Sequence, residues 1–203
     1  MKRFAVILVI AGLLLVGYGG FEWYTAFKAQ KDSLTDAKTM LHEAHAAEKL
    51  TPEKAKEEAG SFKPGQGEVV GVLHVPKLDA DLPIVEGTDA DDLEKGVGHY
   101  KGTAYPLQND QIVLSGHRDT VFRNMGEVKV GDTFVVEMPY GTFTYKVENT
   151  KIVDKDDLTV IVPTAPDEVL TVTTCYPFSY VGDAPERFVW TAVPVDTEET
   201  EQP

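Results

Sequence analysis

The sequence predicts a mainly β domain, a barrel or a sandwich, that follows an N-terminal transmembrane helix and a helical stalk. Beyond residue 66, short runs rich in Val, Ile, Thr, Phe and Tyr alternate with clusters of Gly, Pro, Asn and Asp, which is the pattern of an all-β fold. Before that point the chain is first apolar and then rich in Ala, Lys, Glu and Leu, which favours helices. The change in composition therefore separates two kinds of structure.

The predicted strands end at turn-forming residues. They cover residues 69–75, 82–85, 112–114, 133–138, 142–153, 169–174 and 188–193. One short helix is expected over residues 89–95, where Gly96 ends it. A segment of roughly 130 residues can bury a single core. Residues 61–195 are therefore predicted to form one domain, large enough to be a catalytic domain. The sequence shows no internal repeat.

Residues 4–24 are predicted to cross a membrane as an uncleaved anchor. The stretch carries no charge before Glu22, and about 18 or more such residues can span a bilayer core. Lys2 and Arg3 precede it, which favours a cytoplasmic stub at residues 1–3. A cleaved signal peptide is the alternative, but its apolar core is usually shorter. In both cases the rest of the chain lies outside the cytoplasm.

Residues 25–60 are predicted to form a helical stalk and linker. Phe27, Leu34 and Leu41 recur every seven residues and give the helix a thin apolar stripe. A coiled coil is one interpretation, although Glu48 interrupts the series, and a plain membrane-proximal stalk is favoured over it.

The stalk is expected to end in a second helix that begins with Thr51 as its N-cap and stops at Gly60. At the other end of the chain, residues 196–203 are polar and acidic and are predicted to be a disordered tail. Acidic residues exceed basic ones by 33 to 19 in the 203-residue chain, and no basic stripe is present. Nucleic acid is therefore excluded as an expected partner.

The only cysteine is Cys175, which follows Thr174 at the predicted end of a strand. A lone thiol outside the cytoplasm indicates an intermolecular bridge or a reactive group, because structural cysteines there usually come in pairs. The alternative is an inert cysteine that packs as a small core residue. A strand end before a turn can make a thiol both fixed and reachable.

Cysteine chemistry needs a partner, because a free thiol with a pKa of about 8.5 is only slightly ionised at neutral pH. His117, in the run Ser115-Gly-His117-Arg-Asp, can supply positive charge or take the proton. Arg187 can stabilise a tetrahedral oxyanion through its fork of donors. Taken singly, each has an ordinary alternative: a strand-end histidine, and an arginine paired with a nearby carboxylate. His99 is given a structural role, as a buried hydrogen-bonding residue.

The order of these residues, histidine first and cysteine later, is opposite to that of papain-like enzymes. The motifs do resemble those of the sortases, membrane-anchored cysteine transpeptidases of Gram-positive cell surfaces. The family motif Thr-Leu-x-Thr-Cys is matched by Thr171-Val-Thr-Thr-Cys175, with Val in place of Leu. The histidine motif is matched by Leu114-Ser-Gly-His117-Arg-Asp, and an arginine, Arg187, follows the cysteine.

The resemblance implies an eight-stranded β-barrel with short helices. It implies that Cys175 is the nucleophile, His117 the general acid and Arg187 the donor to the oxyanion or substrate carbonyl. Thr174 matches a threonine that contacts substrate in the family. Residues 155–168 correspond to the loop that walls the substrate groove.

Within the family, the runs Gly98-His-Tyr100 and Tyr180-Val-Gly-Asp-Ala-Pro-Glu-Arg187-Phe look most like class D sortases. The chain lacks an Asp-Pro dipeptide and ends in a polar tail, which is unlike class C. Class D implies Leu-Pro-x-Thr-Ala or Leu-Pro-x-Thr-Gly sorting signals on secreted surface proteins. It also implies an amine acceptor on a peptidoglycan precursor, with a diaminopimelate amine as one candidate.

No cofactor is expected. Some sortases bind calcium through acidic loop residues, and Asp154, Asp156 and Asp157 are acidic here, but a solvated loop is the favoured interpretation. Two functional alternatives stay open beside the transpeptidase. One is a hydrolysing relative that uses the same residues, and the other is a membrane-tethered β-module without activity, in which Cys175 is a core thiol.

Overall fold

The computed structural model describes residues 2–47, 50–180 and 182–195. The predicted acidic tail, residues 196–203, and the first residue of the predicted cytoplasmic stub lie outside the described residues.

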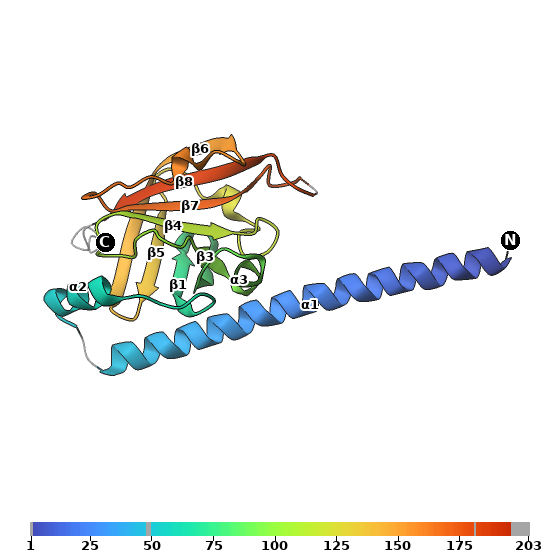
Figure 1. Ribbon diagram of the computed structural model, residues 1–203, viewed down its shortest axis with the longest axis horizontal. Coiled ribbons are helices and arrows are strands. Elements are labelled where there is room, and N and C mark those ends of the chain that lie inside the picture. The colour runs from blue at the N-terminus through green and yellow to red at the C-terminus, as the bar shows by residue number, and fades with distance from the viewer. Residues whose placement is uncertain (1, 48–49, 181, 196–203) are drawn as a thin grey trace.

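The domain is a closed barrel of eight strands, in the order β1-β2-β3-β4-β7-β8-β6-β5, which confirms the predicted fold class (Figure 1). Two neighbouring pairs, β2 with β3 and β4 with β7, run parallel, and the other pairs run antiparallel. The strands are β1 Val69–Val75, β2 Ala80–Glu86, β3 Val97–His99, β4 Gln111–Gly116, β5 Thr133–Met138, β6 Gly141–Asp154, β7 Val169–Tyr176 and β8 Glu186–Pro194.

Every predicted strand is present, within a few residues of its predicted ends, but β3 was not predicted. It is short, and its middle residue, Gly98, is a poor strand former by composition. Packing explains the glycine, because a Cβ atom there would lie 2.4 Å from the carbonyl oxygen of Gly87. Strand β3 therefore depends on its neighbours and not on its own propensity.

The core lies inside the barrel and follows the period-two alternation of the strands. In β5, Phe134, Val136 and Met138 are buried and the residues between them are partly exposed. Trp190 of β8 and Tyr145 of β6 are fully buried beside them. Each such side chain contributes about 1.5–3 kcal/mol by leaving water, so the alternation determines which face of each strand points inward.

The chain begins with one continuous helix, α1 (Lys2–Ala47), whose C-terminal part lies along the barrel while its N-terminal part projects beyond it (Figure 1). Ala37 and Leu41 are buried against Val72 of β1. Nζ of Lys38 lies 2.5 Å from the carboxylate of Asp81 on β2. The C-terminal part of the apolar stripe, at Leu34 and Leu41, is therefore covered by the barrel of its own chain.

The projecting part of α1 is long and apolar enough to cross a membrane. Its most apolar stretch has a mean hydropathy of 2.4, and none of that stretch is buried within the molecule. Phe27, the first residue of the predicted stripe, is also exposed, at 54 %. The helix thus changes from an unpartnered apolar surface to a docked one along its length.

Two short helices and three 3₁₀ turns complete the described fold. Helix α2 (Pro52–Ser61) begins as predicted, with the side chain of Thr51 accepting from the N–H of Lys54, and ends one residue beyond Gly60. Helix α3 (Ala90–Lys95) begins after Asp89, which forms a capping box with Asp92. Short 3₁₀ turns at Pro76–Leu78, Met125–Glu127 and Leu158–Val160 lie in the loops.

Candidate active site

Strand pairing brings His117, Cys175 and Arg187 to adjacent places on the barrel. Strands β4 and β7 run parallel with Gly116 opposite Thr174, so the next residues, His117 and Cys175, leave the same end of the sheet. On the other side of β7, Cys175 pairs directly with Arg187 of β8. Residues that are opposite on neighbouring strands have Cβ atoms about 4.5–5.5 Å apart. The structure therefore brings the three predicted residues together.

Alternation along β7 places Thr174 on the opposite face from Cys175. Thr174 is 3 % exposed, and its hydroxyl donates to the carbonyl oxygen of Gly116 at 2.6 Å. Cys175 is half-buried and free. The Thr174 side chain therefore joins β7 to β4, and Thr174 is also among the residues that line the cavity beside Cys175.

The three residues line a cavity of about 400 Å³ on the outer face of the barrel. Its floor is formed by β4 and β7, and its walls come from α3 and from the β6–β7 loop, residues 155–168. The apolar wall residues are Leu93, Leu158, Val160 and Ile161. The loop predicted to wall a groove does so, and the site combines polar groups at one end with an apolar surface beside them.

His117 is held by its backbone and not by its ring. Its carbonyl oxygen accepts from the N–H of Phe122 at 3.0 Å, which closes the turn after β4. Gly116 is required before it, because a Cβ atom there would lie 2.6 Å from the Phe122 ring. Within residues 2–47, 50–180 and 182–195, no side chain or carbonyl hydrogen-bonds to the His117 ring, and His117 lines the cavity with Cys175 and Arg187.

Arg187 has no carboxylate partner within the described part of the chain. Its Nη1 donates to the carbonyl oxygens of Glu186 and Ala184, at 3.0 and 3.2 Å. Asp183, a carboxylate near it in the sequence, instead pairs with Lys155 at 2.7 Å. That contact raises the pKa of Lys155 and lowers the pKa of Asp183. Donors of the Arg187 guanidinium are thus left for a group in the groove.

Arg118, directly after His117, is a structural residue of the site. No sequence motif assigned it a role. Its Nη2 donates to the carbonyl oxygen of Gly182 at 2.9 Å, and its guanidinium lies 5.8 Å from the centre of the Tyr180 ring. It therefore joins the turn after β4 to the loop between β7 and β8. The only available indication in the sequence was its position beside His117.

Asp154, at the end of β6, and Asp157, in the β6–β7 loop, accept hydrogen bonds within local turns. Asp154 accepts from the N–H of Asp156, and Asp157 accepts from the N–H and hydroxyl of Thr159. The hydrogen bonds from Thr159 lower the pKa of Asp157. Among the residues that the structure describes, no group of three or more His, Cys, Asp or Glu side chains is arranged to hold a metal ion.

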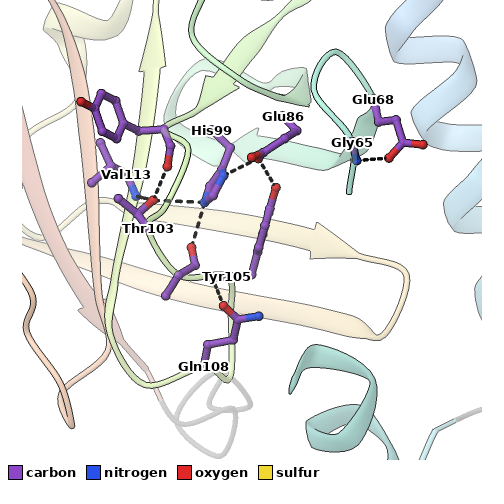
Figure 2. Close-up of polar contacts among 10 residues, drawn as sticks. Gly65, Glu68, Glu86, His99, Thr103, Tyr105, Gln108 and Val113 are labelled. Atoms are coloured by element: carbon purple, nitrogen blue, oxygen red, sulfur yellow. Dashed lines mark hydrogen bonds and ion pairs between the residues drawn. The ribbon is translucent and has the colours of Figure 1, made fainter. Parts of the chain in front are cut away.

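His99 lies behind the groove in a buried polar network (Figure 2). Its Nδ1 is 2.6 Å from Oε2 of Glu86, and the hydroxyl of Tyr105 donates to the same oxygen at 2.6 Å. Its Nε2 donates to the carbonyl oxygen of Ala104 at 2.9 Å. His99 is 1 % exposed, which confirms the predicted structural role.

The fold and the groove define a class of protein: a β-barrel enzyme with one cysteine beside a histidine and an arginine. Residues 73–195 match the sortase domain family model. The chain is 50 % identical over 190 residues to sortase D of Bacillus subtilis strain 168, covering 93 % of this chain and 96 % of that one. The chain therefore belongs to the sortase family of cysteine transpeptidases.

Solved structures of sortases have the same fold as this chain. A Clostridium perfringens sortase D5 transpeptidase, 22 % identical, superposes with a TM-score of 0.68 and covers 83 % of this chain and 99 % of its own. A Clostridium perfringens sortase C, solved with the C-terminal cell wall sorting motif, is 27 % identical with a TM-score of 0.60. That comparison covers 81 % of this chain and 89 % of the sortase C chain.

Proposed function

We propose that this transpeptidase cleaves a Leu-Pro-x-Thr-Ala or Leu-Pro-x-Thr-Gly sorting signal after Thr and joins the released protein to a peptidoglycan amine. One observation carries the proposal. Cys175, His117 and Arg187 occupy neighbouring places on β4, β7 and β8 and open into one cavity. The cavity also has an apolar wall suited to the Leu and Pro of such a peptide, and a related sortase C was solved with a sorting motif.

In the first step, the Cys175 thiolate attacks the carbonyl carbon of the substrate Thr. The electron pair of the carbonyl moves to oxygen, and Arg187 donates hydrogen bonds to the negative charge that develops there. The C–N bond then breaks as His117 gives a proton to the departing nitrogen. The products are a thioester on Cys175 and a free amine on the C-terminal fragment.

In the second step, the acceptor amine attacks the thioester carbonyl and loses a proton to the now neutral His117. The C–S bond breaks, an amide forms, and the Cys175 thiolate returns. The positive charge near the thiol matters in both steps, because the thiolate is the nucleophile and also the leaving group. An unpartnered His117 ring and the free donors of Arg187 are the features that can supply it.

We further propose that α1 holds the enzyme in the cell membrane with its first residues in the cytoplasm and the barrel on the outer surface. The exposed apolar part of α1 supports an anchor. The basic residues at its start support this orientation, because cytoplasmic ends of such helices favour Lys and Arg. The barrel would then face both secreted proteins and the precursors of the cell wall.

The test uses the full-length chain in detergent micelles with both peptides, with and without an added amine such as diaminopimelate. Mass spectrometry should show cleavage after Thr, an acyl adduct on Cys175, and capture of the amine. The Cys175→Ala variant should show none of these. Cleavage to the free acid alone, with every amine tried, would favour a hydrolase, and unmodified peptide throughout would exclude this substrate class.

A further inference from the structure

The β6–β7 loop, residues 155–168, supplies one wall of the groove although it contains little regular structure. Leu158 and Val162 are 65 % and 47 % exposed, so burial of the loop's own side chains does little to hold it. A loop that is not held in place must be ordered when a ligand binds, and that lost entropy weakens binding. What fixes this wall therefore bears directly on how well the groove binds a peptide.

The side chain of Gln111, at the start of β4, holds the centre of that wall. Its Oε1 accepts from the N–H of Val162 at 2.8 Å, and its Nε2 donates to the carbonyl oxygen of Val160 at 2.7 Å. The same Nε2 donates to the hydroxyl of Thr171 on β7 at 2.8 Å. The amide thus joins β4, β7 and the loop in one arrangement.

The pattern imitates the hydrogen bonding of a parallel β-sheet. In a parallel sheet, each residue of one strand faces a residue on the neighbouring strand. Its N–H donates to the carbonyl of the residue before that facing residue, and its carbonyl accepts from the N–H of the residue after it. Gln111 does this with its side chain, and the residue that it faces is Ile161. Ile161 lines the catalytic cavity. Gln111 is only 6 % exposed, so water competes poorly for these bonds.

Asp110 makes a second attachment a few residues further along the loop. Its Oδ1 accepts from the backbone N–H groups of Thr164 and Ala165, at 2.6 and 3.1 Å. Hydrogen bonds from the N–H groups of Gln111 and Thr164 lower the pKa of Asp110. Two consecutive side chains at the start of β4 therefore hold the loop segment that follows Thr159.

We propose that Gln111 is a positioning residue that fixes the Val160–Ile161–Val162 wall before substrate arrives, so that the groove is already formed for the sorting signal. This rests on the proposed function, because it assigns that peptide to the groove. Gln111 does not line the catalytic cavity, and it acts through Ile161. Its loss should therefore weaken peptide binding and leave the chemistry at Cys175 intact.

The chain offers a matched control. Gln108 uses its amide in the same two-sided way: Oε1 accepts from the N–H of Tyr105 at 2.9 Å, and Nε2 donates to the carbonyl oxygen of Ala59 at 2.7 Å. Ala59 lies in α2, outside the groove. Gln108→Leu and Gln111→Leu thus each remove one bond to a backbone N–H and one to a backbone carbonyl and keep a similar side-chain size, and Gln111→Leu also removes the bond to Thr171.

The experiment measures peptide kinetics and amide hydrogen exchange on the full-length chain in micelles. For Gln111→Leu we expect the KM for the better peptide to rise about tenfold or more while kcat stays within about twofold, which is the signature of lost binding alone. Exchange should quicken in fragments covering residues 160–165 and stay unchanged in α2. Gln108→Leu should do the reverse, with faster exchange in α2 and an unchanged KM.

Gln111→Asn, which keeps the amide but shortens its reach by one methylene group, should give a smaller rise in KM, and it serves if the leucine variant does not fold. Faster loop exchange with an unchanged KM would reduce Gln111 to a structural residue and overturn the proposal. Unchanged exchange would show that the amide does not hold the loop. If the wild type processes no peptide, the sorting-signal function fails along with this role, while the exchange data still report whether Gln111 holds the loop.

Discussion

His99 and His117 lie close together on the barrel but in opposite environments. Strand β3 pairs with β4 so that His99 is opposite Leu114, whose side chain is 1 % exposed and points into the core. His117 follows the end of β4 and lines the cavity together with Cys175 and Arg187. His99 has a partner on each ring nitrogen, whereas the His117 ring has none within the described residues.

The difference shows that residue type alone does not indicate a catalytic role. His99 is buried beside an ionised carboxylate and contributes to the folded state. His117 faces a cavity with Cys175 and Arg187, where a proton can move. Satisfied groups stabilise a fold, and unsatisfied groups at a cavity are available for chemistry. The predictions below separate these two roles.

The largest expected effect is on His117. His117→Ala should reduce the rate of peptide cleavage by about 10²–10⁴-fold, because it removes the proposed general acid. It should leave Tm unchanged, because the ring makes no hydrogen bond within the described chain. Steady-state kinetics and thermal unfolding check both parts. His42→Ala, at an exposed position on α1, is the control, and near-normal turnover in His117→Ala would contradict the assignment.

His99→Ala should act in the opposite way. It removes the hydrogen bond between His99 and the buried Glu86 carboxylate, and such a bond to a charged group typically contributes about 1.5–3 kcal/mol of unfolding free energy. Chemical denaturation of the full-length chain measures this loss. The kcat/KM per folded molecule should stay within about threefold of the wild type. A stable His99→Ala protein with lost turnover would mean that His99 belongs to the catalytic machinery.

The pH dependence of stability sharpens the same contrast. Burial by itself raises the pKa of Glu86, but hydrogen bonds from His99 and Tyr105 outweigh it and hold the pKa below its ordinary value. A carboxyl with a lowered folded pKa stabilises the protein above its unfolded pKa, which is about 4.3 for Glu, and loses this contribution as pH falls through the folded value.

Glu86→Gln should therefore have a lower Tm than the wild type at neutral pH, and the gap should narrow as the pH falls below about 4. Scans of Tm against pH for the two proteins provide the measurement. Glu94→Gln, at an exposed position, corrects for general effects of acid. A gap that stays constant down to low pH would show that Glu86 is not ionised in the folded protein.

The smallest effect is expected for the exposed ion pair of Lys155 and Asp183, whose side chains are 37 % and 77 % exposed. Water and salt screen such a pair, so Asp183→Ala should leave Tm unchanged and alter kcat/KM by no more than about twofold. Kinetics at low and high salt provide the check. A large, salt-sensitive loss would indicate that the two loops depend on this contact to shape the groove.

Local pattern predicted much of the fold. The period-two runs identified all strands except β3, and the apolar stretch at the start identified a helix able to cross a membrane. Strand β3 was missed because a central glycine gives no local strand preference, and only its close approach to Gly87 explains it. The stripe on α1 was seen, but nothing local indicates that the barrel covers it.

The candidate site shows the same division. Motif resemblance selected Cys175, His117, Arg187 and Thr174, and all four line one cavity. Their roles in catalysis and substrate binding stay predictions. Gln111 lies just outside the predicted strand, residues 112–114, and no local pattern gives its side chain a role. Its role depends on a loop that is 49 residues away from it in the chain.

The sequence by itself determined the elements of this protein: an apolar helix, an acidic β domain, and one thiol near a histidine and an arginine, all of which follow from local composition and spacing. Only the tertiary structure decided which strands are neighbours, because pairing joins residues as far apart as Gly116 and Thr174, 58 positions along the chain. The identity of neighbouring strands determines which side chains share a face. Burial of the core then determines which face is left for the groove.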